Sequence, residues 1–186
     1  MKYGPDRNAA FERFIKCFKL ATAEIREIYI LLPIDGSPSL KYRERVYCYE
    51  LYHQLRVVMG DDFGYTLGGE VDKSAHPIMK GGFKPDLLVH TPGDMRGNLV
   101  VIEVKPVMAK RQDIEKDLKT LTSFRKQGRY HQAVYLIYGD DKKRLNKIRK
   151  MARELETKYQ DHRIDLSLIM LFWHRVSGCA AEHIIW

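Results

Sequence analysis

The chain has 186 residues, of which 45% are hydrophobic and 30% charged, so it can bury a core of its own and does not have the composition of a disordered segment. The net charge is +8, and all of the excess lies between Lys105 and Arg163, where 17 basic residues face 8 acidic ones. Three widely spaced cysteines indicate neither a disulfide framework nor a zinc knuckle, and no apolar segment resembles a signal peptide or a membrane span. We therefore expect a single domain, residues 1–186, in the cytoplasm and without a membrane partner.

Hydrophobic spacing predicts elements in an order that is typical of a mixed α/β protein. In chain order, they are helices over 8–30 and 40–59, strands over 63–67, 86–90 and 99–105, a helix over 112–126, a strand over 133–138, a helix over 142–159 and a strand over 166–173. This order predicts a central mixed sheet flanked by helices. The apolar end, Ile184-Ile185-Trp186, is expected to pack onto the domain or onto a partner.

Two neighbouring apolar runs carry charged residues at one end. Pro85-Asp86 opens the first run, and Glu103-Val104-Lys105 closes the second. Because side chains alternate along a strand, Glu103 and Lys105 should point to one face and Val104 to the other. A hairpin that brings Asp86 beside Glu103 creates a cluster of two carboxylates and one lysine. Such a cluster can hold Mg²⁺ and activate a water against a phosphodiester.

This arrangement resembles the PD-(D/E)xK nucleases, the restriction-endonuclease-like superfamily. The matching residues are Asp86 and, after a spacer of ordinary length, Glu103-Val104-Lys105. The resemblance covers roughly residues 42–138, the ααβββαβ core of that superfamily. It implies an α/β fold with a restriction-endonuclease-like core, to which the first helix and the last helix and strand are added. It also implies a metal-dependent endonuclease that hydrolyses phosphodiester bonds, with DNA favoured over RNA as substrate.

The resemblance assigns roles to the motif residues. Asp86 and Glu103 would bind Mg²⁺ or Mn²⁺, and the backbone carbonyl of Val104 would add a ligand. Lys105 would stabilise charge on the attacked phosphate or orient the attacking water, and a lowered pKa would suit it to proton transfer. The ordinary alternatives are a turn residue for Asp86, a surface partner of Lys105 for Glu103, and a strand-end surface lysine for Lys105.

A further acidic residue is expected upstream of the motif. Glu50 is preferred, because members of the superfamily often place a glutamate on the helix before the first core strand. Glu44, six residues earlier on the same predicted helix, is the rival. Glu70, at the end of the strand that should neighbour the Asp86 strand, either completes the acidic cluster or caps a loop. The sequence leaves the choice among these three open.

Basic residues on or beside the predicted helix over 112–126 are expected to contact the phosphate backbone, since the superfamily often uses this region so. These residues are Lys110, Arg111, Lys116, Lys119, Arg125 and Lys126. A solvated helix face explains several of them equally well. Because cutting both strands of a duplex usually takes two active sites, a homodimer is one expected form of the enzyme.

Two other functions fit the same sequence. One is a catalytically weak or inactive nucleic-acid-binding module, or a nuclease subunit, on the same fold. The other is an interaction protein whose basic helices bind an acidic partner. The presence of the complete motif of Asp86, Glu103 and Lys105 favours the enzyme.

Overall fold

The computed structural model describes residues 6–69, 84–159 and 161–186, and its centre is a six-stranded sheet whose strands lie side by side in chain order. The strands are β1 (Thr66–Gly69), β2 (Leu87–His90), β3 (Asn98–Pro106), β4 (Gln132–Tyr138), β5 (Ile169–His174) and β6 (Glu182–Ile184). The first three form an antiparallel meander, β3 to β5 run parallel, and β6 returns antiparallel to β5. The predicted mixed sheet is confirmed.

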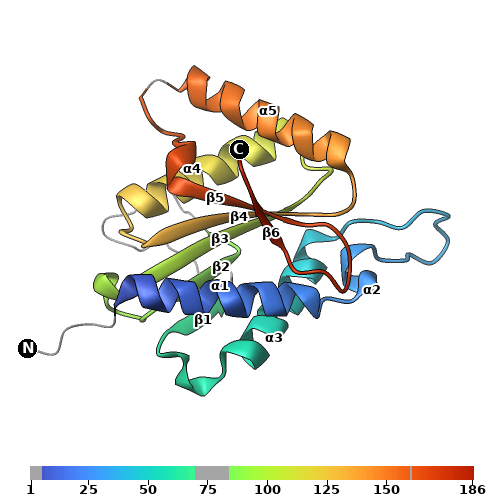
Figure 1. Cartoon of the computed structure of the whole chain (residues 1–186). Helices are drawn as coiled ribbons and strands as arrows, with labels where there is room; N and C mark the ends of the chain where they lie inside the picture. The colour runs from blue at the N-terminus through green and yellow to red at the C-terminus, as the bar shows by residue number, and fades with distance from the viewer. Residues whose placement is uncertain (1–5, 70–83, 160) are drawn as a thin grey trace, which may run out of the picture.

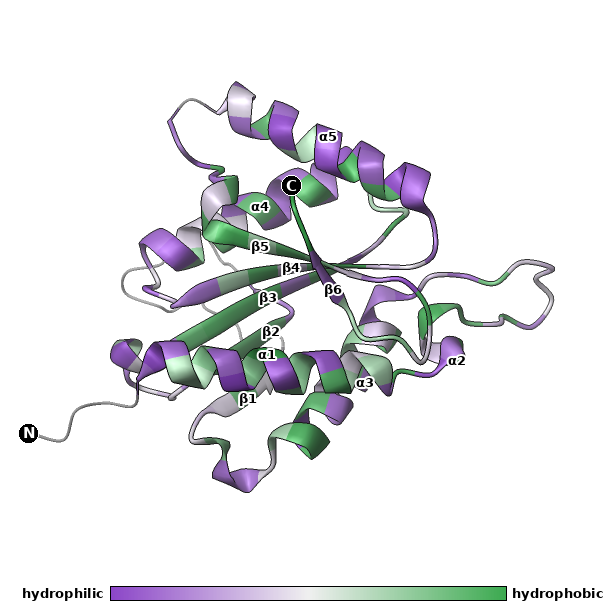
Figure 2. Cartoon of the chain, in the orientation of Figure 1, coloured by the Kyte–Doolittle hydropathy of each residue, from purple (hydrophilic) through white to green (hydrophobic). Residues whose placement is uncertain are grey.

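Helices cover both faces of the sheet, as Figure 1 shows. One face carries α1 (Arg7–Ala23), α2 (Glu27–Ile30) and α3 (Glu44–Met59), and the other carries α4 (Arg111–Lys126) and α5 (Lys142–Lys158). Short 3-10 helices lie at η1 (Asp61–Phe63), η2 (Met95–Gly97) and η3 (Leu166–Leu168). Figure 2 shows the apolar strands between helices whose surfaces are largely hydrophilic, and a buried apolar cluster fills each space between sheet and helices.

Alternation along β3 determines which side chains meet which helices. Ile102 and Val104 join the apolar cluster beneath α1 and α3, whereas Val101 joins the cluster beneath α4 and α5. Glu103 and Lys105 continue the alternation of Val101 and therefore face the α4 side of the sheet. The predicted separation of these two side chains from Val104 is confirmed.

Several element boundaries differ from the prediction. The predicted helix over 8–30 is broken, because the Ile25 N–H bonds to the Thr22 carbonyl and the regular helical pattern stops there. The predicted helix over 40–59 begins only at Glu44, since a β-bridge between Leu32 and Lys41 keeps the preceding chain extended.

The first and last strands also begin later than predicted. The strand expected over 63–67 spans Thr66–Gly69, because residues 61–63 form a 3-10 turn that ends at Gly64 with a left-handed φ of 84°. A left-handed φ of this kind suits glycine, which has no Cβ to clash with the backbone. The strand expected over 166–173 begins at Ile169, after the 3-10 helix η3.

The C-terminal part of the chain returns to the end of α1. The Thr22 hydroxyl accepts a 2.9 Å hydrogen bond from the Ala181 N–H, and the Ser177 hydroxyl donates a 2.9 Å bond to the Ile25 carbonyl. Strand β6, which the sequence analysis missed, follows and pairs with β5. The indole of Trp186 donates a 2.7 Å bond to the Ile169 carbonyl, so the apolar end packs onto the sheet. Within the described residues, no helix combines the length and the apolar character that a membrane crossing requires.

His174 on β5 makes the fold sensitive to acid. It is fully buried, and the Tyr47 hydroxyl lies 2.7 Å from its Nδ1. Burial lowers the pKa of His174 from 6.5 to about 4. The unfolded chain therefore binds a proton below about pH 6.5 that the folded protein excludes down to about pH 4, so the stability falls as the pH decreases through this window. We expect this residue to account for a loss of about 3 kcal/mol across the window.

Urea unfolding at several pH values between about 4.5 and 7 measures this effect. The change His174→Asn, which keeps a hydrogen-bond acceptor for Tyr47, should flatten the pH dependence. His183→Asn, on the exposed side of β6, is the matched control and should keep the wild-type dependence. An unchanged pH dependence in the His174 variant would contradict the assignment.

Candidate active site

The register of β2 against β3 brings Asp86 to Glu103. Leu87 pairs with Ile102 in the antiparallel ladder, so the residue before Leu87 stands across from the residue after Ile102. The Asp86 carboxylate accepts a 2.7 Å hydrogen bond from the Val104 N–H. This side-chain bond continues the hairpin by one step beyond β2, which begins only at Leu87. The predicted proximity of the two carboxyl groups is confirmed.

The same bond shows where the Val104 carbonyl points. In a strand, the N–H and C=O of one residue project toward the same neighbouring strand. Because the Val104 N–H points to Asp86, the Val104 carbonyl also lies on the Asp86 side of β3. The resemblance names both the Val104 carbonyl and the Asp86 carboxylate as metal ligands, and the two groups thus lie on the same side of β3.

Lys105 lies between two acidic side chains from different helices. Its Nζ is 2.8 Å from Glu44 Oε1 on α3 and 3.4 Å from Asp117 Oδ2 on α4. The Lys105 side chain is only 12% exposed. Burial by itself disfavours the ammonium form, but the carboxylates of Asp117, Asp86 and Glu44 outweigh it and raise the pKa of Lys105. The expected lowering of this pKa is therefore wrong, and Lys105 stays protonated at neutral pH.

Glu103 is a buried acidic residue of this cluster. It is 5% exposed, and its carboxyl group has a pKa well above the ordinary value. Burial is the main cause, and the negative charges of Asp86 and Asp117 add to it, while Lys105 acts in the opposite direction. A positive charge placed beside Asp86 and Glu103 would oppose this shift of the pKa by favouring the ionised carboxylates.

Asp117 belongs to the same cluster, and the sequence analysis missed it. Burial raises its pKa to about 7, with Lys105 opposing the shift and Asp86 and Glu44 adding to it. The Tyr135 hydroxyl, on β4, lies 3.4 Å from Asp117 Oδ2 and can donate to it. A signal was present in the sequence, since Asp117 lies in the apolar stripe of α4 formed by residues 114, 118 and 121. A carboxylate in such a stripe is unusual and needs a partner.

The structure brings Glu44, and not the preferred Glu50, to Lys105. Glu50 instead accepts a 2.7 Å hydrogen bond from Gln54, one turn further along the same helix, where both side chains are partly buried. Six residues are not a whole number of helical turns, so the two glutamates project from different sides of α3. Glu70, the third candidate, lies outside the described residues.

A hollow of about 400 Å³ opens beside this cluster and gives solvent and ligands a path to Asp86. Its lining comes from α3, from the end of β1, and from the start of β2 with the residue before it: Cys48, Tyr49, Tyr52, Gly69, Asp86 and Leu87. Burial, together with the charges of Asp86 and Glu44, raises the pKa of the Cys48 thiol. Cys48 therefore stays protonated and is not an activated nucleophile.

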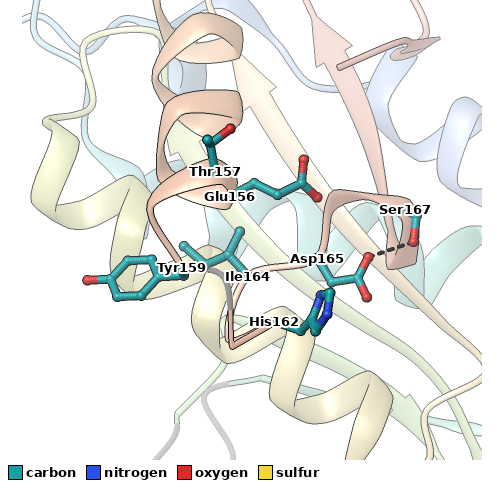
Figure 3. Close-up of a pocket in the computed structure, with 7 residues that line it drawn as sticks. All are labelled: Glu156, Thr157, Tyr159, His162, Ile164, Asp165 and Ser167. Atoms are coloured by element: carbon teal, nitrogen blue, oxygen red, sulfur yellow. Dashed lines mark hydrogen bonds between the residues drawn. The ribbon is translucent and has the colours of Figure 1, made fainter.

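A larger hollow, of about 680 Å³, lies at the C-terminal end of α5 (Figure 3). It is lined by Glu156, Thr157, Tyr159, His162, Ile164, Asp165 and Ser167. Its carboxylates are already engaged, since Asp165 accepts a 2.6 Å bond from Ser167 and Glu156 accepts a 2.7 Å bond from the Leu166 N–H. This hollow is at the opposite edge of the sheet from Lys105, and its side chains mainly hold the segment between α5 and β5.

Three of the basic residues that were expected to contact phosphate make internal contacts. Lys119 pairs with Glu115 at 2.7 Å, and Lys126 pairs with Asp165 at 3.4 Å. Arg125 is half-buried and donates to two backbone carbonyls of the loop after α4. These three side chains already have partners, so their use for nucleic acid would require breaking existing contacts.

The other three expected basic residues are more accessible. Arg111 forms a 2.7 Å pair with Glu154, and both partners are exposed. Lys110 and Lys116 are exposed and form no ion pair within the described part of the chain. Lys110 immediately precedes α4, at the end of the sheet where Lys105 lies.

The donor chemistry of the cluster fits a hard divalent cation. Mg²⁺ prefers oxygen ligands, keeps several waters and is often bound by one or two carboxylates. Asp86, Glu103 and the Val104 carbonyl provide such oxygens. A preformed group of three or more His, Cys, Asp or Glu side chains in metal-binding geometry is absent from residues 6–69, 84–159 and 161–186.

Comparison with known proteins finds no family model, no curated protein and no solved structure that matches this chain. The residues of the cluster and their geometry are therefore the basis for inferring a function.

Asp117 should make the metal-free protein less stable as the pH rises. An ordinary aspartate ionises near 3.8, whereas folded Asp117 keeps its proton up to about pH 7. Between these values the folded state binds more protons than the unfolded state, so the free energy of unfolding falls with increasing pH, by no more than about 4 kcal/mol. Asp117→Asn should reduce this dependence, as measured by urea unfolding in EDTA at about pH 5 and pH 8.

The control for this measurement is Asp113→Asn, an exposed carboxylate in the first turn of the same helix. It should leave the pH dependence unchanged. If the Asp117 and Asp113 variants behave alike, Asp117 does not hold a proton in the folded protein.

Proposed function

We propose that the protein is a divalent-metal-dependent nuclease of the PD-(D/E)xK type, with DNA as its favoured substrate. The observation that carries the proposal is the meeting of Asp86 and Glu103 across β2 and β3, with Lys105 on the same face of β3 as Glu103. An ordinary surface ion pair does not explain this arrangement. Glu103 is buried among other carboxylates, and Lys105 pairs with Glu44 and Asp117 instead of with Glu103.

The residues of the cluster would have different roles in phosphodiester hydrolysis. Asp86, Glu103 and the Val104 carbonyl would hold the cation. A bound divalent cation lowers the pKa of a coordinated water and neutralises charge at the scissile phosphate. Lys105, which stays protonated, donates hydrogen bonds to the phosphate as negative charge grows there. This charge-stabilising role is the one we propose, because a lysine with a raised pKa is a poor proton acceptor.

Glu44 and Asp117 act on Lys105 and not on the phosphate. The two carboxylates hold the ammonium from two sides, so its position is set before any substrate arrives. A charged group that is already oriented needs no reorganisation when the transition state forms. Tyr135 in turn lies within reach of Asp117 and helps to orient it.

A nucleic-acid-binding module with little or no cleavage is the second candidate. The observation in its favour is that the described residues hold no group of three or more His, Cys, Asp or Glu side chains already in metal-binding geometry. The first candidate remains preferred, because Mg²⁺ sites often use only one or two carboxylates and complete the shell with waters and substrate phosphate.

Cleavage assays test the enzyme proposal directly. Supercoiled, linear, single-stranded and branched DNA, and RNA, are incubated with Mg²⁺, Mn²⁺ or EDTA. We expect metal-dependent cutting that falls by at least about 100-fold in Glu103→Ala and in Lys105→Ala, since each change removes a group that acts at the transition state. Both variants are checked for folding by circular dichroism.

Metal binding is measured in parallel by thermal unfolding. Mg²⁺ or Mn²⁺ should raise the Tm of the wild type, because a ligand that binds only the folded state stabilises it, and Asp86→Asn should abolish the rise. Metal binding without cutting of any substrate would favour the binding module or a nuclease subunit that needs a partner. No metal binding and no cutting would rule out the nuclease. The expected homodimer stays a prediction, which light scattering of the same samples tests.

The two glutamates of α3 provide a matched pair of variants. Glu44→Gln should lower the cleavage rate by about tenfold or more, because Lys105 loses the negative charge of the partner that lies 2.8 Å away, which a neutral amide does not replace. Glu50→Gln, six residues along the same helix, should stay within about twofold of the wild type, since its hydrogen bond to Gln54 can be kept by an amide. The reverse order of effects would place the functional acid at Glu50.

A further inference from the structure

Several elements meet at the edge of the sheet where Lys105 lies. Strands β3, β4 and β5 are parallel, so their C-terminal ends share one edge. Helix α4 follows β3 and helix α5 follows β4, and both therefore begin at this edge (Figure 1). The N-terminal ends of two helices and the carboxyl cluster are thus neighbours in space.

The outer face of α5 is strongly basic. The helix contains eight basic and two acidic residues, and Figure 2 shows it as one of the most hydrophilic elements. Its apolar side chains, at 145, 148, 152 and 155, face the domain. Lys143, Lys147 and Lys150 lie on the opposite, exposed side, and Lys142 is exposed at the first position. In the described part of the chain, none of these four lysines forms an ion pair.

A second group of cations reaches the same edge from the α3 side. Lys41 and Arg43 are exposed and flank Tyr42. The Tyr42 ring packs edge-on against Tyr138, with 5.7 Å between the ring centroids. It also lies so close to Gly139 that a Cβ there would come within 2.7 Å of the Tyr42 hydroxyl. This packing holds Lys41 and Arg43 against the end of β4, just before α5.

These cations can offset the repulsion between the carboxyl cluster and a negatively charged substrate. Those carboxyl groups of the cluster that are ionised repel a phosphodiester when no cation is bound. Exposed lysines at the same edge attract the polyanion and raise its concentration beside the cluster. The basic residues of α4 serve this purpose less well, because Lys119 and Lys126 are already paired.

We propose that the exposed lysines of the first two turns of α5, with Lys110, form a phosphate-binding surface that leads the sugar–phosphate backbone of a nucleic acid to Lys105. This inference rests on the proposed nuclease function and moves the main backbone contacts from α4, where the sequence analysis put them, to α5. DNA and RNA share the chemistry that this surface recognises, and contacts of this kind position a strand without reading its sequence.

Fluorescence anisotropy with labelled 20-base-pair DNA and RNA duplexes tests the proposal. Titrations of the full chain are run in EDTA, which stops metal-dependent cutting, and repeated in Ca²⁺. The double variant Lys143→Gln/Lys147→Gln removes two exposed lysines one helical turn apart. We expect its Kd to rise about tenfold, and the slope of log Kd against log salt concentration to fall by about 2, because two phosphate contacts are lost.

The matched control is Lys16→Gln/Lys19→Gln, which removes two exposed lysines one turn apart on α1, over the other face of the sheet. It changes the net charge equally and should leave Kd and the salt slope near the wild-type values. Thermal unfolding shows that both variants are folded. Preference for the DNA or the RNA duplex identifies the natural source of the backbone and supports the proposal in either case.

Three results would overturn the proposal: equal weakening by both double variants, no weakening by the α5 variant, or binding of polyglutamate in place of both duplexes. The last result would assign the surface to an acidic protein. Because binding is measured without cleavage, this surface can fail while metal-dependent cutting persists. Equally, cutting can be absent while α5 still binds the duplex, so the two proposals are tested separately.

Discussion

The position of one buried ammonium group organises this end of the protein. Lys105 extends from the end of β3 and pairs with Glu44 on α3 and with Asp117 on α4, so a single side chain joins the two helical layers through the sheet edge. Removing the lysine charge from water costs free energy, and so does removing the carboxylate charges. The attraction between them offsets both costs, because neither group is stable in this position without the other. The remaining imbalance falls on Glu103, whose ionised form is disfavoured by burial and by its acidic neighbours. Under the proposed function, a divalent cation would supply the positive charge that favours this ionised form.

Much of the fold follows from local patterns in the sequence. Two neighbouring apolar runs, one opened by Asp86 and the other closed by Glu103-Val104-Lys105, predicted that a hairpin brings Asp86 to Glu103, because pairing register and side-chain direction are both set within the hairpin. The boundaries of α1, α3 and β1 were less predictable. They depend on contacts between distant or non-helical segments, such as the bridge of Leu32 with Lys41. The spacing of hydrophobic residues along the sequence does not indicate such contacts.

The candidate site was predictable only in part, for similar reasons. Which glutamate of α3 reaches Lys105 depends on the rotation of that helix over the sheet, and a sequence window does not contain this information. Asp117 was visible as a carboxylate within an apolar stripe, but its partner comes from another element. The excess of positive charge was located correctly in the second half of the chain. Its division into lysines that are paired, such as Lys119, and lysines that face solvent, such as Lys147, required the tertiary structure.

The hydrogen bond between Thr22 and Ala181 has a consequence for how the protein is made. The two residues are 159 positions apart, and the neighbouring bond from Ser177 to Ile25 spans 152 positions. Contacts of such long sequence separation form late in folding, because the chain loses the entropy of a large loop before the contact can stabilise it. During synthesis, the end of α1 emerges from the ribosome long before its partner segment exists. Helix α1 is thus completed by a segment that is translated 152 to 159 positions later, and α1 must remain without this support until then.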